Sequence, residues 1–175
     1  MLYKQQSFSN FEPDLRYLDS FPFSREEFLF FDIETTGFSP RNTSLYLIGA
    51  VCFLDEHWTF LQWFAETPSE ECEILNAFLA FCRSFRAVVH FNGDGFDIPY
   101  LLFKAEKYTL SDTLSSMQSI DLYRLTRPYK KYLKLTHINQ KSLESFLGIE
   151  REDRYNGGEP VSYTHLRAHE TSAHL

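Results

Sequence analysis

Two carboxylates separated by one residue have the clearest chemical meaning in this sequence. The run from Phe28 to Phe31 is apolar and predicts a buried strand, and Asp32 and Glu34 follow it at positions i and i+2. Because strand side chains alternate between two faces, these acids project to the same side. Two like charges at the end of a buried strand are costly unless a cation neutralises them, and a hard divalent ion does this best. The pair therefore predicts a metal site.

A third carboxylate, Asp97, follows a second predicted strand. Residues 87–91 form a short apolar run, the glycine-containing turn 92–95 comes next, and a helix is predicted to begin directly after it. In an open α/β sheet, ligands collect beyond the carboxyl ends of the central strands. We expect Asp97 to join Asp32 and Glu34 there, where the three acids could share one cation or a pair. On its own, Asp97 would be interpreted as a helix cap.

In order along the chain, these motifs resemble a known family. The patterns Asp32-x-Glu34-Thr-Thr-Gly and Phe-Asn-Gly-x-x-Phe-Asp97-x-Pro are similar to the first two motifs of the DEDD exonucleases, whose fold is ribonuclease H-like. Further stretches resemble one predicted bacterial branch of that family, namely residues 45–49, 62–64, 119–123, 127–130 and 141–149. The resemblance covers residues 28–160.

The resemblance implies two-metal hydrolysis of a phosphodiester bond from a 3′ end. Asp32 would bridge two Mg²⁺ or Mn²⁺ ions, and Glu34 and Asp97 would each hold one side. The family also has a fourth acid on a later helix, about four residues after a Tyr or His that positions the attacking water. The sequence does not show this fourth acid, so the resemblance implies an incomplete site.

Several neighbours of these acids could contact the terminal nucleotide of such a substrate. Thr35, Thr36 and Gly37 follow the first strand, and glycine permits close approach of a backbone. Asn92, in the turn after the second strand, could hydrogen-bond the same nucleotide. For all four residues, a role in shaping the turn is an equal alternative.

Three other polar residues are expected to have supporting roles. Asp94 lies in the glycine turn, where Asp is common for backbone reasons. His90 lies on an apolar strand, which favours a hydrogen-bonded core histidine over a catalytic base. Asp121 ends a predicted strand and could approach the site, but it matches no ligand motif of the family.

A basic segment follows the predicted strands. Between Arg124 and Lys141 there are six basic residues and no acidic one, with tyrosines at 123, 129 and 132. A positive strip with aromatic side chains suits single-stranded nucleic acid, and we expect Lys130, Lys131 and Lys134 to contact it. The alternative is a solvated surface with the tyrosines in the core. The net charge of −7 argues against coating of nucleic acid by bulk electrostatics.

An α/β fold is needed to position these groups. Apolar and alternating runs predict strands over 28–35, 45–54, 58–65, 87–91 and 119–122. Helices are predicted after Ser69, after the turn 92–95, and over 140–148. Together with the resemblance, this order predicts a ribonuclease H-like fold. Its mixed five-stranded sheet would combine an antiparallel three-strand meander with parallel strands, flanked by helices.

The composition predicts one domain with a good core. The chain has 175 residues, 43% of them hydrophobic and 17% aromatic. It has no apolar run near the length of a membrane span and no signal-peptide segment at its start, so we expect a cytoplasmic protein that does not bind membranes. Three scattered cysteines, Cys52, Cys72 and Cys82, predict buried free thiols rather than a disulfide or zinc site.

The two ends of the sequence differ from its middle. Residues 1–25 carry prolines, serines and isolated aromatics and are interpreted as an arm lying on the domain of residues 26–160. Residues 161–175 hold three of the six histidines and none of the eighteen phenylalanines. They resemble one reading frame of a transposase adapter used in DNA sequencing. We therefore expect a non-native tail and a natural protein that continues beyond Pro160.

The leading hypothesis is a metal-dependent 3′ to 5′ exonuclease acting on single-stranded DNA or RNA, inactive in this truncated form. One alternative is a ribonuclease H-like module that binds nucleic acid without catalysis. Another is an endonuclease on the same fold. The natural downstream sequence would discriminate the first two, because a helix bearing Tyr-x-x-x-Asp or His-x-x-x-Asp supports the enzyme.

Overall fold

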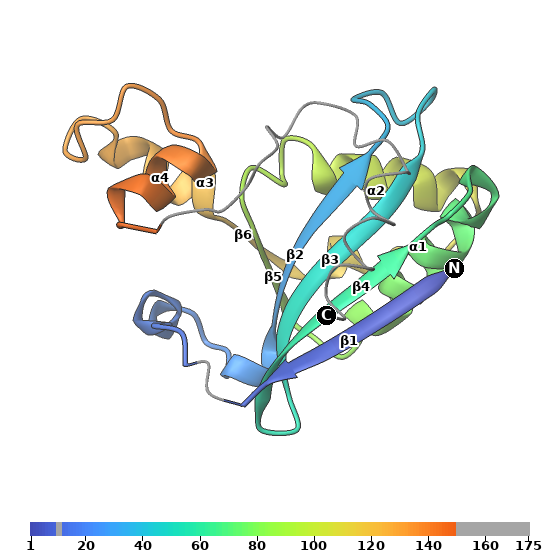
Figure 1. Ribbon diagram of the computed structural model, residues 1–175, viewed down its shortest axis with the longest axis horizontal. Coiled ribbons are helices and arrows are strands. Elements are labelled where there is room, and N and C mark those ends of the chain that lie inside the picture. Colours follow the sequence, from blue (N-terminus) through green and yellow to red (C-terminus); the bar gives the residue numbers. More distant parts are fainter. Residues whose placement is uncertain (10–11, 150–175) are drawn as a thin grey trace, which may run out of the picture.

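The computed structural model describes residues 1–9 and 12–149 and has a six-stranded mixed sheet with helices packed on it (Figure 1). The strands are β1 (Leu2–Phe8), β2 (Phe28–Thr35), β3 (Leu45–Leu54), β4 (His57–Phe64), β5 (Ala87–His90) and β6 (Gln118–Asp121). The α-helices are α1 (Glu71–Cys82), α2 (Asp97–Lys107), α3 (Leu122–Thr126) and α4 (Gln140–Phe146). The strand order in the sheet is β1-β4-β3-β2-β5-β6.

The predicted fold class is confirmed, with one strand more than predicted. The strands β2, β3 and β4 form the antiparallel meander, and β5 and β6 run parallel to β2. The added strand is β1, which pairs antiparallel with β4 from Leu2 opposite Phe64 to Phe8 opposite Trp58. The sequence of β1, LYKQQSF, does not alternate between apolar and polar residues, which is the pattern from which strands are predicted. All seven residues of the strand are exposed, so no buried face imposes such an alternation.

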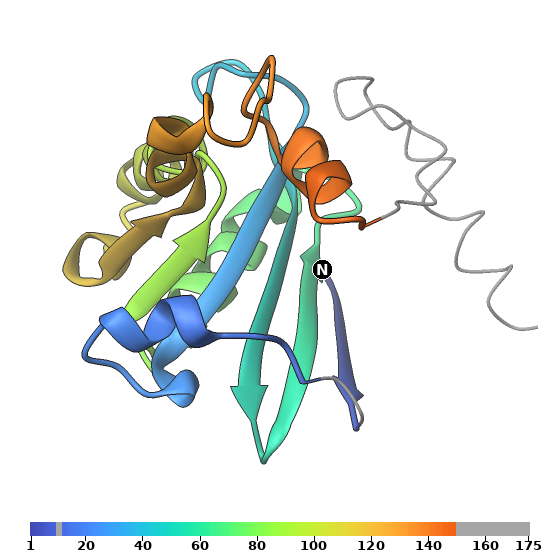
Figure 2. The same ribbon diagram turned by 90° about the vertical axis from the view of Figure 1, so that its left-hand side faces the viewer.

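Two layers of side chains cover the sheet. On one face, Leu29, Phe31 and Ile33 of β2 pack in the main core with the buried side of α1, which includes Ile74 and Phe78. Figures 1 and 2 place α1 and α2 together on this face. Burial of such aliphatic and aromatic side chains stabilises the fold by about 1.5–3 kcal/mol for each side chain. This packing holds β2 rigidly at the centre of the molecule.

The opposite face has a smaller core at one end. Leu18, from a short 3₁₀ helix over Arg16–Ser20, packs with Phe28, Val89 and Ile120. The N-terminal segment therefore supplies both an edge strand and a cover for this end of the sheet. In both views, α3 and α4 lie at the other end, toward which β2 runs (Figures 1 and 2).

All three cysteines are free thiols; Cys52 and Cys82 are buried as predicted, whereas Cys72 is only partly buried. None of the helices in the described part of the chain has the length and apolar character that a bilayer crossing needs. The predicted tail, residues 161–175, lies outside the described residues, as does the end of the predicted domain.

Candidate metal and nucleic-acid site

The first two acids lie on one face of β2. Residues of β2 alternate along the strand, so that Phe31 and Ile33 are buried against the helices while Asp32 and Glu34 are exposed on the other side. Directly across from Asp32 on β3 is Gly49, which has no side chain to cover the carboxylate. The strand thus presents both carboxylates on the side away from its buried residues.

The third acid lies next to β2 because β5 ends early. This strand pairs with β2 only along residues 28–30. Beyond that point the backbone N–H of Ile33 donates to Oδ1 of Asp97, at 3.3 Å. Asp97 is the first residue of α2 and is 6% exposed. Its carboxylate therefore occupies the position beside β2 that a longer β5 would have filled.

The three carboxylates repel one another. Burial, followed by the charge of Asp32, raises the pKa of Asp97 to about 6. Partial burial and the same neighbouring charge raise the pKa of Glu34. Carboxylate oxygens are the ligands that Mg²⁺ and Mn²⁺ prefer, so the donor set fits a hard divalent cation that would relieve this repulsion. Their role as metal ligands stays a prediction.

The loop after β2 uses its hydroxyl groups internally. Thr35 donates to the carbonyl of Gly37 at 2.9 Å, and the hydroxyl of Thr36 accepts from the N–H of Ser44, also at 2.9 Å. A Cβ on Gly37 would lie 2.9 Å from Cγ2 of Thr43, so glycine is needed for the loop to close. These contacts support the turn interpretation of the three residues. A substrate could still approach their backbone.

Asn92 differs from these residues because its side chain is available. It has a positive φ of 62°, a conformation that Asn tolerates better than most residues. Its N–H donates to Asp121 and its carbonyl accepts from Gly95, but its exposed amide makes no hydrogen bond with the described residues. A contact between this amide and a substrate therefore stays a prediction.

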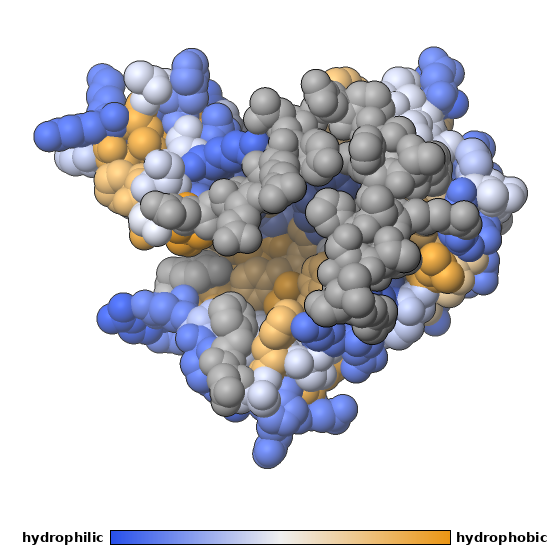
Figure 3. All heavy atoms as spheres, in the orientation of Figure 1, coloured by the Kyte–Doolittle hydropathy of each residue, from blue (hydrophilic) through white to orange (hydrophobic). Residues whose placement is uncertain are grey.

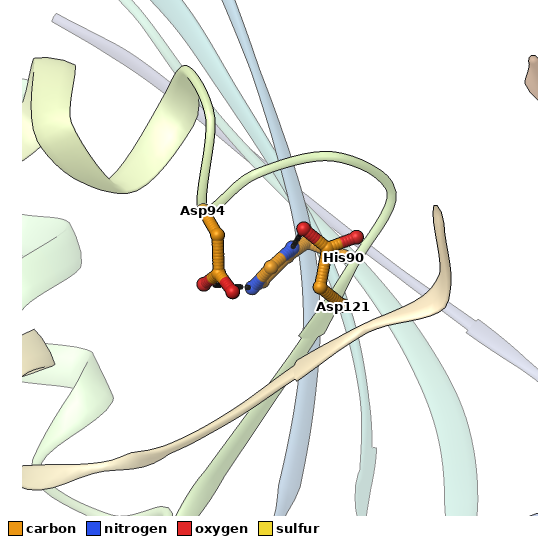
Figure 4. A group of neighbouring side chains, drawn as sticks. All are labelled: His90, Asp94 and Asp121. Atoms are coloured by element: carbon orange, nitrogen blue, oxygen red, sulfur yellow. Dashed lines mark ion pairs between the residues drawn. The ribbon is translucent and has the colours of Figure 1, made fainter. Parts of the chain in front are cut away.

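A second group of possible ligands, His90, Asp94 and Asp121, lies behind that turn (Figure 4). Each offers one ligand atom within 4.8 Å of the others. Nδ1 of His90 accepts from the N–H of Gly93 at 3.0 Å, and Nε2 lies 2.8 Å from the hydroxyl of Ser119. Burial lowers the pKa of His90, which favours the neutral ring that these bonds require. Both ring nitrogens are thus engaged, and the group acts as a hydrogen-bonded support.

His90 and Asp121 lie where they were expected, whereas Asp94 makes more contacts than expected. His90 is 4% exposed and hydrogen-bonded, as expected of a core histidine. Asp94 does more than shape its turn, because it accepts from Ser119 at 2.5 Å and pairs with Arg124 at 2.8 Å. Asp121 lies close to the site, as its place at the end of β6 suggested. The sequence gives no signal for the pairing between Asp94 and Arg124.

The basic segment is exposed and so are two of its tyrosines. Tyr129 is 59% exposed and Tyr132 is 85% exposed, which contradicts the alternative that the tyrosines belong to the core. The three predicted contact residues Lys130, Lys131 and Lys134 are exposed and form no ion pair within residues 1–9 and 12–149. Only Tyr123 is partly buried, with its ring 5.9 Å from that of Phe91.

One residue of the site was missed by the sequence analysis. Phe38, in the loop after β2, is 86% exposed, and its ring lies 5.9 Å from that of Phe96, the residue before Asp97. A large aromatic side chain in a polar loop, one residue after Gly37, was the available signal. Figure 3 shows that the open face is hollowed near its centre, with apolar side chains in the hollow.

Comparison with solved structures supports the fold. Escherichia coli exonuclease I in its zinc-bound complex with single-stranded DNA gives a TM-score of 0.52 at 17% identity, covering 85% of this chain and 41% of that one. The same enzyme with a dT13 oligonucleotide gives 0.52 at 18% identity, covering 83% and 40%. The chain therefore spans about two fifths of the exonuclease I chain. At these identities the likeness shows the fold alone.

Comparison by sequence identifies the family. No curated protein matches the chain significantly. The family model described as the RNase_H superfamily matches residues 29–166, which is most of the chain and includes every acid of the site. With the sheet order and the acids at the strand ends, this match leads to one conclusion: the chain belongs to the RNase H superfamily.

Proposed function

We propose that this chain carries the metal site of a 3′ to 5′ exonuclease that hydrolyses single-stranded nucleic acid. The observation that supports this best is the bond from Ile33 N–H to Asp97. It brings a buried acid from the start of α2 to the two acids of β2, where burial and mutual repulsion raise the pKa of Asp97. Acids with raised pKa values that converge at strand ends are typical of functional sites.

The proposed ligands are Asp32, Glu34 and Asp97, which would hold two Mg²⁺ or Mn²⁺ ions. Such ions supply an activated water nucleophile and stabilise the charge that develops on the leaving oxygen. The chain itself contributes the orientation of the ligands. The antiparallel pairing with β3 fixes Asp32 and Glu34, and the N–H of Ile33 fixes one oxygen of Asp97.

The proposed substrate site extends from these acids across the open face. The exposed ring of Phe38 could stack on a terminal base, and Asn92 has an exposed amide in the neighbouring turn. The basic segment would contact the phosphates of the following nucleotides. The exonuclease I structures that share the fold are complexes with single-stranded DNA, one of them with zinc bound, which supports this substrate class. DNA and RNA are both candidates, and the free thiols suit action in the cytoplasm.

The test is hydrolysis of end-labelled single strands of DNA and RNA by a protein that continues naturally past Pro160. We expect degradation from the 3′ end in the presence of Mg²⁺ or Mn²⁺, and none after addition of EDTA. Asp32→Ala and Glu34→Ala should abolish it, whereas Asp112→Ala, an exposed acid away from the site, should not. Full activity in the first two variants would show that another site is responsible.

A binding module without catalysis is the second candidate. The exposed lysines and tyrosines of the basic segment would serve binding alone equally well. Such a module would bind single strands and metal ions but would not degrade any substrate, even with its natural continuation. The remaining possibility is an endonuclease on the same fold. Circular substrates test for it, because an endonuclease would cut them and an exonuclease would not.

A further inference from the structure

Asp121 ties together two segments of the proposed site with one oxygen atom. It is the last residue of β6 and is 4% exposed. Its Oδ1 accepts from the N–H of Asn92 at 2.8 Å. The same oxygen accepts from the N–H groups of Tyr123 at 2.9 Å and Arg124 at 3.4 Å, in the first turn of α3. The turn before α2 and the start of the basic segment thus share one anchor.

The anchored turn leads directly to Asp97 and has little freedom. The carbonyl of Gly93 accepts from the N–H of Ile98 at 2.9 Å, which joins the turn to the first turn of α2. A Cβ on Gly93 would lie 2.6 Å from the ring of His90, so the turn is packed tightly against β5. Asn92 itself has a positive φ, which surrounding contacts must hold. A shift of Asn92 would therefore be transmitted to Asp97.

Asp94 provides a second connection between the turn 92–95 and the segment formed by β6 and α3. Asp94, in the same turn, pairs through Oδ2 with Nη1 of Arg124 at 2.8 Å and accepts through Oδ1 from Ser119 of β6. The turn is thus held at two points by β6 and α3. Asp121 is the central group, because its carboxylate is the buried one and binds both segments through backbone atoms. Its Oδ2 accepts no hydrogen bond within the described residues.

We propose that Asp121 is a positioning residue that sets the orientation of Asp97 and couples it to the basic segment. It acts through its hydrogen bond to Asn92, and the bonds to α3 extend the same anchor to Arg124. The inference rests on the proposed function in that Asp97 is taken as a metal ligand. Mutations of groups that orient metal ligands typically weaken metal binding about 10–100-fold.

The first test compares Asp121→Asn with Asp121→Ala by amide hydrogen exchange without metal. Asn keeps an oxygen that can accept the three N–H bonds and loses the charge, whereas Ala loses both. We expect faster exchange over residues 92–98 in the Ala variant, near wild-type exchange in the Asn variant, and unchanged exchange in α1. The matched control is Asp112→Ala, since Oδ1 of Asp112 also accepts a backbone N–H, that of Ser115 at 3.0 Å.

Hydrogen exchange at the wild-type rate over residues 92–98 in the Ala variant would overturn the proposal, regardless of the Mn²⁺ affinity of that variant. If Asp121→Ala does not fold, Asp121→Ser takes its place, because its hydroxyl is too short to reach Asn92. The same expectation and the same contradicting result apply to it.

The second test measures Mn²⁺ affinity by calorimetry. The Ala variant should bind at least about tenfold more weakly, and the Asn variant within about threefold of wild type. Equal losses in both variants would mean that Asp121 acts through its charge or as a ligand, which contradicts positioning. If Asp32→Asn binds Mn²⁺ like wild type, the proposed metal site is wrong, and the exchange experiment alone then decides whether Asp121 holds the turn.

Discussion

Asp97, at the start of α2, combines three properties that are individually unfavourable for a carboxylate. Asp97 is buried, it faces another carboxylate, and it shares that neighbour with Glu34. One backbone N–H, that of Ile33, compensates only part of the desolvation. A bound cation would reduce the repulsion between these carboxylates. The stability of the folded protein should therefore depend on both pH and metal concentration.

Asp97 should make the metal-free protein less stable as the pH rises. Its folded pKa of about 6 lies above the unfolded value of 3.8, so the folded state binds more protons between these values. Stability should therefore fall from about pH 4 to pH 6, by up to about 3 kcal/mol from this group. Asp97→Asn keeps an acceptor for Ile33 and should lack this contribution to the fall, leaving only the smaller share that the raised pKa of Glu34 causes. Denaturant titrations of both proteins at several pH values, with EDTA present, measure the difference. A variant less stable than wild type at pH 8 would contradict the assignment.

Metal binding should stabilise the protein at neutral pH. Mn²⁺ or Ca²⁺ binds only the folded site and relieves the repulsion among the three acids, so either ion should raise the Tm. The increase should shrink strongly in Asp32→Asn. Differential scanning fluorimetry with increasing Mn²⁺ measures both, and Asp112→Asn serves as an exposed control. An equal response in wild type and Asp32→Asn would remove the proposed site.

At the scale of elements, the loop after β2 is held by a buried polar network between α1 and α2. Lys104 of α2 and Glu71 of α1 are 1% and 2% exposed and pair at 2.8 Å. Lys104 also donates to the carbonyl of Thr43 at 2.6 Å, and Glu71 accepts from the N–H of Leu45 at 2.7 Å. Tyr108 donates to the other oxygen of Glu71. The network thus fixes the distal end of the loop that carries Phe38.

Removal of the lysine should be costly. Lys104→Met leaves Glu71 buried without its cation, and breaking a buried pair in this way typically costs about 3–5 kcal/mol. The double variant Lys104→Met with Glu71→Gln removes both charges and should regain part of the loss. Urea denaturation of the three proteins measures the two effects. A loss below about 1 kcal/mol in the single variant would show that the pair is not buried as described.

The basic segment should contribute to substrate binding and not to metal binding. Replacing Lys130, Lys131 and Lys134 together by Gln should weaken single-strand binding. Each phosphate that a lysine no longer neutralises reduces the log-log salt slope by about 0.7, so the slope should fall by up to about 2. Fluorescence anisotropy with a labelled single strand at several salt concentrations measures this.

The matched control replaces three exposed cations near the ends of α1 and α2, Arg83, Arg86 and Lys107, by Gln. This variant has the same charge change outside the basic segment and should keep the wild-type salt slope. An unchanged slope in the lysine variant would return the segment to the solvated-surface interpretation.

At the scale of the whole molecule, one face of the sheet is covered by α1 and α2, and α3 and α4 lie at the end toward which β2 runs (Figures 1 and 2). Asp32 and Glu34 are exposed on β2, on the side away from its buried residues Phe31 and Ile33. Asp97, Phe38 and the basic segment come from other parts of the chain, so the proposed site depends on elements far apart in the sequence.

Removal of residues 161–175 should leave the stability of the protein unchanged. These residues have no apolar periodicity and resemble adapter-derived sequence, so they should add no buried surface. The Tm of a chain ending at Pro160 should equal that of the full chain within error. Replacing the tail by the natural continuation should instead raise the Tm and allow hydrolysis. A large loss of stability on deletion would contradict the adapter interpretation.

Local patterns in the sequence determined much of the site. Alternation along β2 put Asp32 and Glu34 on one face, and the predicted bounds of β2 and β3 agree with the structure residue for residue. These features follow from strand geometry and burial of neighbouring residues, which depend on a few consecutive positions. The turn before α2 was predictable for the same reason. The sequence also located the basic segment.

Only the tertiary structure decided how these parts meet. The strand β1 was missed because all of its residues are exposed and its partner strand β4 lies fifty or more positions away in the sequence. The bond from Ile33 to Asp97 exists because β5 ends before β2 does, and the anchor at Asp121 because β6 lies next to β5. Such contacts depend on which strands become neighbours and where each one stops. Periodicity along the chain carries no information about either.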